Sequence, residues 1–121
     1  MNCLFCEIAK GNIPSYTIYE DEKVIVFLDI HPRSNGHMLI VPKTHYIDIM
    51  DVNQDILNYI YKTIAPMLYK KLNDQLKIDG LMINQNNGIV QDVKHYHVHL
   101  VPRYTKDHPI VDVKEMFELL K

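Results

Sequence analysis

The chain has 121 residues and a formal net charge of −2 at pH 7, with 47% hydrophobic and 23% charged residues. This length supports one domain with a buried core, and the charge gives no electrostatic reason to expect nucleic acid or an anionic membrane as a partner. No apolar run approaches the roughly 20 residues that span a bilayer, and the first residues do not resemble a signal peptide. We therefore expect one domain over residues 1–121, in the cytoplasm, where the two cysteines would not form a structural disulfide.

The sequence pattern predicts helices and strands in a mixed order along the chain. We expect a short helix at residues 3–9, strands at 15–20, 23–30 and 37–41, a long helix after residue 51, strands at 81–84 and 95–101, and a last helix at 111–120. β-Branched and aromatic residues favour the strands, whereas Gly, Pro and Asn mark the loops. Strands grouped around one long helix indicate an α+β domain with an antiparallel sheet. One sheet face would cover the helix, and the other can carry a site.

The long helix has the clearest periodicity. Apolar residues recur every four positions from Ile56 to Leu76, which gives an amphipathic stripe. Asp51 and Gln54 have the spacing of a capping box. Pro66 falls inside the pattern and should kink or split the helix, and Gly80 should end this region.

Three histidines alternate in the run His95-Tyr96-His97-Val98-His99-Leu100-Val101. Read as a strand, this run places the three imidazoles on one face, because residues two apart point the same way, with neighbouring rings about 7 Å apart. The apolar residues between them would pack on the core. Clustered imidazoles serve either a catalytic metal with an open position or covalent catalysis by an imidazole that attacks phosphorus. Composition alone does not separate these two chemistries.

The two cysteines have the spacing Cys3-x-x-Cys6, which fits half of a tetrahedral zinc site. His45 and His95 are the candidates to complete it. Two alternatives remain open on spacing alone. The cysteines can pack as small hydrophobic residues, or they can form a redox pair, although the βαβ context expected for such a pair is missing.

Two further segments favour a nucleotide ligand. Asn84, Gln91 and the backbone around Gly88 precede the histidine run and can donate hydrogen bonds to phosphate oxygens. The segment from Phe27 to Ile30 offers an apolar wall for a base and one carboxylate, Asp29, for ribose hydroxyls. Taken singly, Phe27 would more often be a core residue and Asp29 an ordinary strand-end residue.

With these residues in view, the sequence resembles the histidine triad (HIT) family, whose motif alternates three histidines with apolar residues. The matching segments are His95 to Val101 followed by Pro102-Arg103, Cys3-Leu4-Phe5-Cys6, Ile13-Pro14, Phe27-Leu28-Asp29-Ile30-x-Pro32, Gly36-His37, Val41-Pro42-Lys43-x-His45 and Asn84. They cover about residues 3–104 and leave a C-terminal tail at 105–121. The order and spacing of so many segments make the resemblance specific, and it is greatest to short bacterial-type members that carry the cysteine pair.

The resemblance implies a HIT-like fold, which is a five-stranded antiparallel sheet with one long helix and short terminal helices, in a homodimer. It also implies hydrolysis at the α-phosphorus of a purine nucleoside phosphoramidate or a related nucleotide conjugate, through a nucleotidyl-histidine intermediate. A diadenosine polyphosphate hydrolase is the alternative within the enzyme class. A nucleotide-binding regulatory module with little turnover is the alternative outside it.

The resemblance also assigns roles to residues. His97 would attack phosphorus, His99 would hydrogen-bond the phosphate or the leaving group, and His37 would orient the triad from behind. The residues that match the family's nucleotide site are Leu4, Phe5, Ile8, Phe27, Asp29, Ile30, Asn84 and Gln91. Those that match its structural zinc site are Cys3, Cys6, His45 and His95, which makes a three-histidine catalytic metal site improbable.

The loop before the triad departs from the family pattern at two positions. Members often have Gly-Gln-Ser or Gly-Gln-Thr there, whereas this chain has Val90-Gln91-Asp92. Val90 disfavours a positive φ, so the loop backbone should differ. Asp92 puts a carboxylate where a hydroxyl would contact the leaving group. We expect Asp92 either to point to solvent or to favour an amine leaving group.

Overall fold

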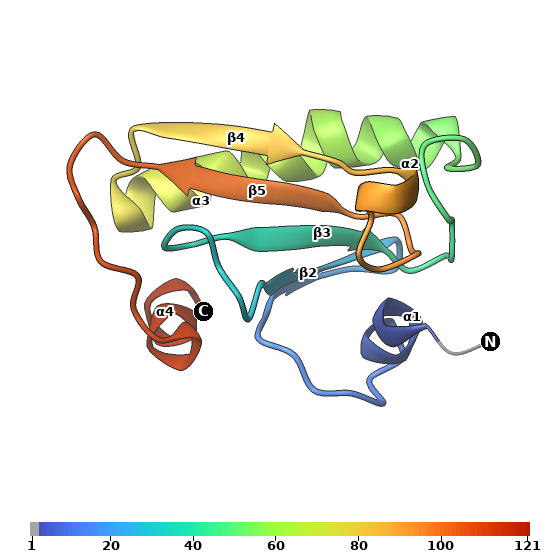
Figure 1. Cartoon of the computed structure of the whole chain (residues 1–121), viewed down its shortest axis with the longest axis horizontal. Helices are drawn as coiled ribbons and strands as arrows, with labels where there is room; N and C mark the ends of the chain where they lie inside the picture. The colour runs from blue at the N-terminus through green and yellow to red at the C-terminus, as the bar shows by residue number, and fades with distance from the viewer. Residues whose placement is uncertain (1–2) are drawn as a thin grey trace.

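The computed structural model describes residues 3–121, which form one five-stranded antiparallel sheet in the order β1-β2-β3-β5-β4 (Figure 1). The elements are α1 (Leu4–Ala9), β1 (Thr17–Glu20), β2 (Val24–Leu28), β3 (Met38–Pro42), α2 (Gln54–Tyr59), a π-helical turn (Ile60–Ile64), α3 (Ala65–Leu76), β4 (Gly80–Asn84), a short 3₁₀ turn (Gly88–Val90), β5 (Val98–Arg103) and α4 (Val113–Leu120). The α+β class and the strand number expected from the sequence are confirmed. No helix in the described part of the chain is long and apolar enough to cross a membrane.

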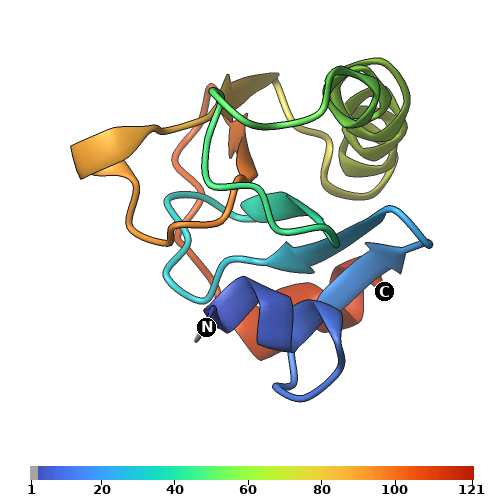
Figure 2. The ribbon, with the colours of Figure 1, turned by 90° about the vertical axis from the view of Figure 1, so that its right-hand side faces the viewer.

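Two of the three inner strands, β2 and β3, are buried along their whole length, because both faces of the sheet are covered there. Alternate residues face two different apolar clusters. One cluster joins Val24, Val26 and Ile40 to the long helix and to α4. The other joins Phe27 and Leu39 to α1 on the opposite face. Figure 2 shows α1 and the α2–α3 helix on opposite sides of the sheet.

The long helix runs without a break in the chain from Gln54 to Leu76, 23 residues, and packs its apolar stripe on the sheet. Near Pro66, where a kink or a split was predicted, the structure has a π-helical turn just before the proline, in which the Ala65 N–H bonds to the Ile60 carbonyl five residues back. Proline has no N–H to donate, and Pro66 follows this wider turn as the second residue of α3.

Both predicted ends of this helix need correction. Its N-cap is Asn53, whose side chain accepts from the N–H groups of Asp55 and Ile56. Asp51 instead accepts from Ile47 and Asp48 in the preceding loop. At the other end the cap is Lys77, in a left-handed conformation with φ 54°. Gly80 begins β4.

The histidine run also differs from its prediction. Strand β5 begins at Val98, so His95, at a bend, and His97 precede the strand. The Tyr96 N–H bonds to the Tyr46 carbonyl at 2.7 Å, which ties this stretch to the loop after β3 rather than to the ladder. The alternation nevertheless persists. Tyr96, Val98 and Leu100 are fully buried in the core under the long helix, and the histidines face the other side.

Candidate functional site

The four predicted metal ligands lie together beside α1. Two ligand atoms come from α1 and its N-cap, Cys6 Sγ and Cys3 Sγ, one from the loop after β3, His45 Nδ1, and one from the histidine run, His95 Nδ1. All four atoms lie within 4.8 Å of one another. The helix positions the cysteines one turn apart, so both sulfurs reach the same point.

The spacing and chemistry of this group suit a tetrahedral metal ion. Cys3 Sγ lies 3.3 Å from His95 Nδ1, Cys6 Sγ lies 3.3 Å from His45 Nδ1, and the two ring nitrogens are 3.2 Å apart. A tetrahedral zinc with ordinary bond lengths requires ligand atoms about 3.3–3.8 Å apart. His95 Nε2 donates to the Pro42 carbonyl at 2.8 Å, which leaves the Nδ1 lone pair free to bind a metal. Burial first, and then Cys3, raise the pKa of the Cys6 thiol to about 11, so a bound cation is what would favour the thiolate here.

His97 presents one free ring nitrogen. Its Nδ1 lies 2.7 Å from the His95 carbonyl, which can only accept, so Nδ1 carries the proton. The opposite nitrogen, Nε2, is therefore unprotonated in the neutral ring. The Phe5 ring meets the His97 ring edge-on, with centroids 5.0 Å apart, and holds it in place. His97 is buried, but it lines a cavity, so this nitrogen can reach a ligand.

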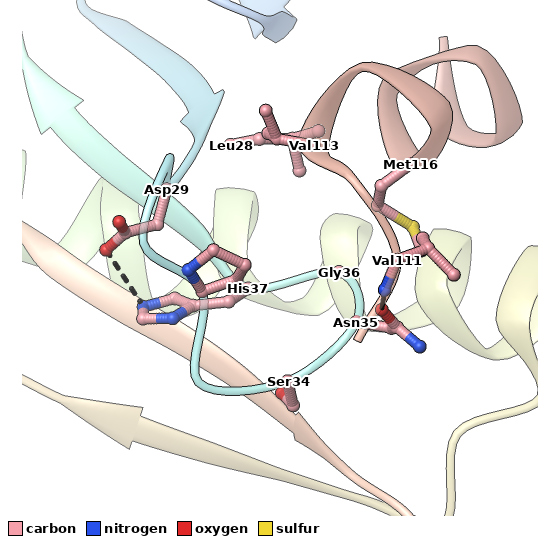
Figure 3. A pocket seen from close by; sticks show the side chains of 10 residues that line it. Leu28, Asp29, Ser34, Asn35, Gly36, His37, Val111, Val113 and Met116 are labelled. Atoms are coloured by element: carbon pink, nitrogen blue, oxygen red, sulfur yellow. Dashed lines mark hydrogen bonds and ion pairs between the residues drawn. The ribbon is translucent and has the colours of Figure 1, made fainter. Parts of the chain in front are cut away.

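A chain of hydrogen bonds fixes the tautomers of His37 and His99. The Arg33 N–H donates to His37 Nδ1 at 3.0 Å, so His37 carries its proton on Nε2. That group lies 2.9 Å from His99 Nδ1, which must accept. His99 then carries its proton on Nε2, the nitrogen left for a ligand. Asp29 supports the pair, with Oδ2 3.5 Å from His37 Nε2, as Figure 3 shows.

Burial keeps these imidazoles neutral. It lowers the pKa of His37 against the attraction of Asp29, and the nearby Arg33 lowers it further. Burial, followed by the neighbouring His97 and His37, lowers the pKa of His99 to about 4. At neutral pH His99 is therefore a neutral donor, which can stabilise charge developing on an oxygen without drawing a proton from solution.

A cavity of about 620 Å³ opens in front of His97 and His99, a size typical of small-molecule sites. Six of the eight predicted nucleotide-site residues line it: Leu4, Phe5, Ile8, Phe27, Asp29 and Ile30. The lining residues absent from that prediction are Ile13, Pro14, Ser15, Tyr16, Leu28, His31, Leu39, Asp92 and Val93. For the lining residues between α1 and β1, the Ile13-Pro14 match was the only sequence signal. The conformation of this loop brings them to the site, and periodicity does not predict it.

The two remaining predicted residues do not line the cavity. Asn84 pairs with His99 across the sheet, so their side chains share a face. Gln91 is buried and its amide donates to the Ile47 carbonyl at 2.6 Å, which fastens the loop before the triad to the loop after β3. Gln91 Oε1 is buried without a hydrogen-bond partner in the described residues.

The two departures in this loop have different outcomes. Val90 lies in the 3₁₀ turn, and the positive φ of this loop is at Gly88 instead, at 66°. The Asp92 side chain is 80% exposed, which agrees with the expectation that it points to solvent. Its Oδ1 nevertheless lies 3.7 Å from His97 Nε2. The carboxylate therefore borders both solvent and the unprotonated nitrogen of His97.

Comparison with known proteins identifies the family. The HIT domain model matches residues 10–106, so the chain belongs to the HIT (histidine triad) family. An uncharacterized HIT-like protein of Methanocaldococcus jannaschii is 41% identical over 94% of this chain and 88% of its own length. The adenosine 5'-monophosphoramidase HNT1 of Saccharomyces cerevisiae is 39% identical over 84% of this chain and 62% of its own length.

The fold is also that of solved members of the family. The structure of a zinc-bound histidine triad family protein from Mycobacterium smegmatis superposes with a TM-score of 0.89, at 35% identity, over 99% of this chain and 91% of that protein. The predicted HIT fold is therefore confirmed, and a solved relative holds zinc.

Proposed function

We propose that this protein hydrolyses a purine nucleotide conjugate at its α-phosphorus, with His97 Nε2 as the nucleophile. The observation that carries this proposal is the hydrogen bond from His97 Nδ1 to the His95 carbonyl, which leaves Nε2 as a lone pair facing the cavity. A neutral imidazole in this state is a good nucleophile towards phosphorus. The yeast relative named a phosphoramidase supports a nucleoside phosphoramidate as the substrate class.

The reaction takes place in two steps. His97 Nε2 bonds to phosphorus as the bond from phosphorus to the leaving nitrogen breaks, and that nitrogen takes a proton from solvent. Water then bonds to phosphorus, the Nε2–phosphorus bond breaks, and one water proton returns to solution. His99 donates from Nε2 to a phosphoryl oxygen throughout. His37 fixes the tautomer of His99, so this donor is aligned before the substrate arrives.

The cavity suits a nucleoside next to that phosphorus. Phe5 and Phe27 form an edge-on aromatic pair, with centroids 5.4 Å apart, which together with Leu4, Ile8 and Ile30 gives an apolar wall for the base. Asp29 lies at the end of β2 between this wall and the histidines, where its carboxylate can accept from ribose hydroxyls. That Asn84 and Gln91 donate hydrogen bonds to the phosphate stays a proposal.

We further propose that Cys3, Cys6, His45 and His95 hold a structural zinc ion. The ligand distances and the zinc-bound relative support this. Zinc bound there would link α1, the loop after β3 and the histidine run. The zinc ion would thereby hold in place the His95 carbonyl, which orients the His97 ring. Thiolate ligands need a reducing compartment, which supports a location in the cytoplasm.

The exposed edge of the sheet supports a homodimer. Strand β4 is an edge strand whose Met82 and Ile83 are 41% and 44% exposed. Ile89 and Val90, in the loop that follows, are 99% and 65% exposed. Apolar side chains beside an unpaired edge favour pairing with a second chain, and a second copy of this chain meets that need by continuing the sheet.

The function is tested by His97→Ala with adenosine and guanosine phosphoramidates, a diadenosine polyphosphate, and nucleoside monophosphate binding measured in parallel. We expect hydrolysis of a phosphoramidate to be lost in the variant while monophosphate binding persists. Preference of the wild type for the polyphosphate would favour the alternative hydrolase. Binding without turnover of any substrate would favour the regulatory module.

A further inference from the structure

The charges that border the cavity are all of one sign. Among the described residues that line it, the acidic side chains are Asp29 and Asp92, and there is no lysine or arginine. The two carboxylates differ in place. Asp29 accepts from the His31 N–H at 2.8 Å and lies beside His37 and His99, whereas Asp92 lies at the exposed rim beside His97 Nε2.

Nothing in the described residues neutralises Asp92. The nearest lysine in sequence, Lys94, is turned to the backbone of its own loop, where its ammonium donates to the Gly88 and Gln91 carbonyls. No lysine or arginine of the described residues lies within 4.0 Å of the Asp92 carboxylate, and its one charged-group contact is His97. The Asp92 carboxylate is therefore not ion-paired with a lysine or arginine of the described residues.

Asp92 lies at the rim of the cavity, over which the leaving group would extend. His97 Nε2 attacks phosphorus, and the leaving group must depart on the side opposite to the attack. The nucleoside fills the apolar end of the cavity, so the leaving group extends over the rim towards solvent. Asp92 lies at this rim beside Nε2 rather than opposite it, so it acts on the leaving group only through its field at longer range.

We infer that Asp92 selects substrates by the charge of their leaving group, favouring conjugates whose leaving amine carries an additional positive charge and disfavouring anionic ones such as polyphosphates. This inference rests on the proposed function and names the substrate class within it. Asp92 acts as a specificity residue through its field and forms no bond in either step. A unit charge about 6 Å from a carboxylate, in surroundings between protein and water, changes affinity about tenfold in each direction.

The test uses three adenosine 5'-phosphoramidates of equal length, whose leaving groups are ethylenediamine, n-propylamine and β-alanine. They end in an ammonium, a methyl group and a carboxylate. We expect wild-type kcat/KM to fall in that order. In Asp92→Asn the ratio of kcat/KM for the cationic substrate to that for the anionic substrate should fall by at least about tenfold, whatever the rate of the variant with the neutral substrate. Raising the salt concentration should narrow the wild-type ratio, because salt screens an exposed charge.

The matched control is Asp107→Asn, which removes the same charge from an exposed loop residue that does not line the cavity. It should keep the wild-type ratio. If the wild type hydrolyses all three substrates through His97 at equal rates, or if Asp92→Asn keeps the wild-type ratio, the inference is overturned and the proposed function stands. If the wild type hydrolyses none of them, with adenosine or with guanosine, both fall.

Discussion

Replacing Gly36 with alanine tests how tightly the loop before His37 is held. Gly36 has φ +90°, and a Cβ built there would lie 2.9 Å from Leu76 Cδ1, 3.0 Å from Leu72 Cδ2 and 3.3 Å from Pro102 Cγ. Leu72 is fully buried and cannot move aside freely. The positive φ costs alanine about 1–2 kcal/mol, and the overpacking adds about 1–2 kcal/mol. We expect Gly36→Ala to lower the free energy of unfolding by about 2–4 kcal/mol.

Gly11→Ala is the matched control, because Gly11 has a similar φ of +83° but no neighbouring atom within 4 Å of the point that an alanine Cβ would occupy. It should lose only the backbone part, about 1–2 kcal/mol. Urea denaturation of both variants gives the difference directly. Gly36→Ala should also slow turnover, since Gly36 directly precedes His37 (Figure 3) and a shift of this loop moves His37 away from His99. Equal destabilisation of the two variants would refute the packing argument.

Three more predictions concern the metal group, the buried imidazoles and the sheet edge. Cys3→Ser should bind less zinc than the wild type, as measured by elemental analysis, and should have a lower melting temperature. Wild-type protein without stoichiometric zinc would contradict the proposed zinc site. For His99, whose folded pKa of about 4 lies below its unfolded value, the contribution to stability is complete above the unfolded pKa near 6.5 and is lost as pH falls from there towards 4. Urea denaturation should therefore show wild type losing about 2 kcal/mol more than His99→Asn between pH 7 and pH 5, and equal losses would contradict the burial argument. Ile83→Asp should give monomers in sedimentation experiments, whereas Ile110→Asp, at another exposed position, should not; a monomeric wild type would refute the proposed dimer.

The sequence predicted best what depends on periodicity and residue chemistry. The alternation in the histidine run placed Tyr96, Val98 and Leu100 in the core correctly, although the strand itself starts only at Val98. The error arose because alternation describes any extended chain, whether or not it is paired in a ladder. Backbone pairing depends on a distant partner, here the Tyr46 carbonyl.

The helix ends were harder for a related reason. Asp51, Asn53 and Gln54 all fit a helix start, and only the three-dimensional course of the loop decides that Asp51 caps the preceding turn. Pro66 likewise indicates a disturbance of the helix, but not its form. The π-helical turn that accommodates it is a packing outcome.

For the site, residue types and spacing indicated the candidate metal ligands, and the family resemblance added eight of the seventeen residues that line the cavity. They could not reveal which nitrogen of each imidazole is free. That depends on single backbone contacts, the Arg33 N–H on His37 and the His95 carbonyl on His97. Nor could they place Gln91, whose side chain is used inside the loop.

The most direct test of the mechanism is to quench a turnover reaction and locate the nucleotidyl group by mass spectrometry, with NMR to distinguish the two ring nitrogens. We predict a nucleotide bonded to Nε2 of His97, because Nδ1 is held by the His95 carbonyl. Attachment at Nδ1, attachment at another residue, or undiminished turnover by His97→Ala would contradict the account.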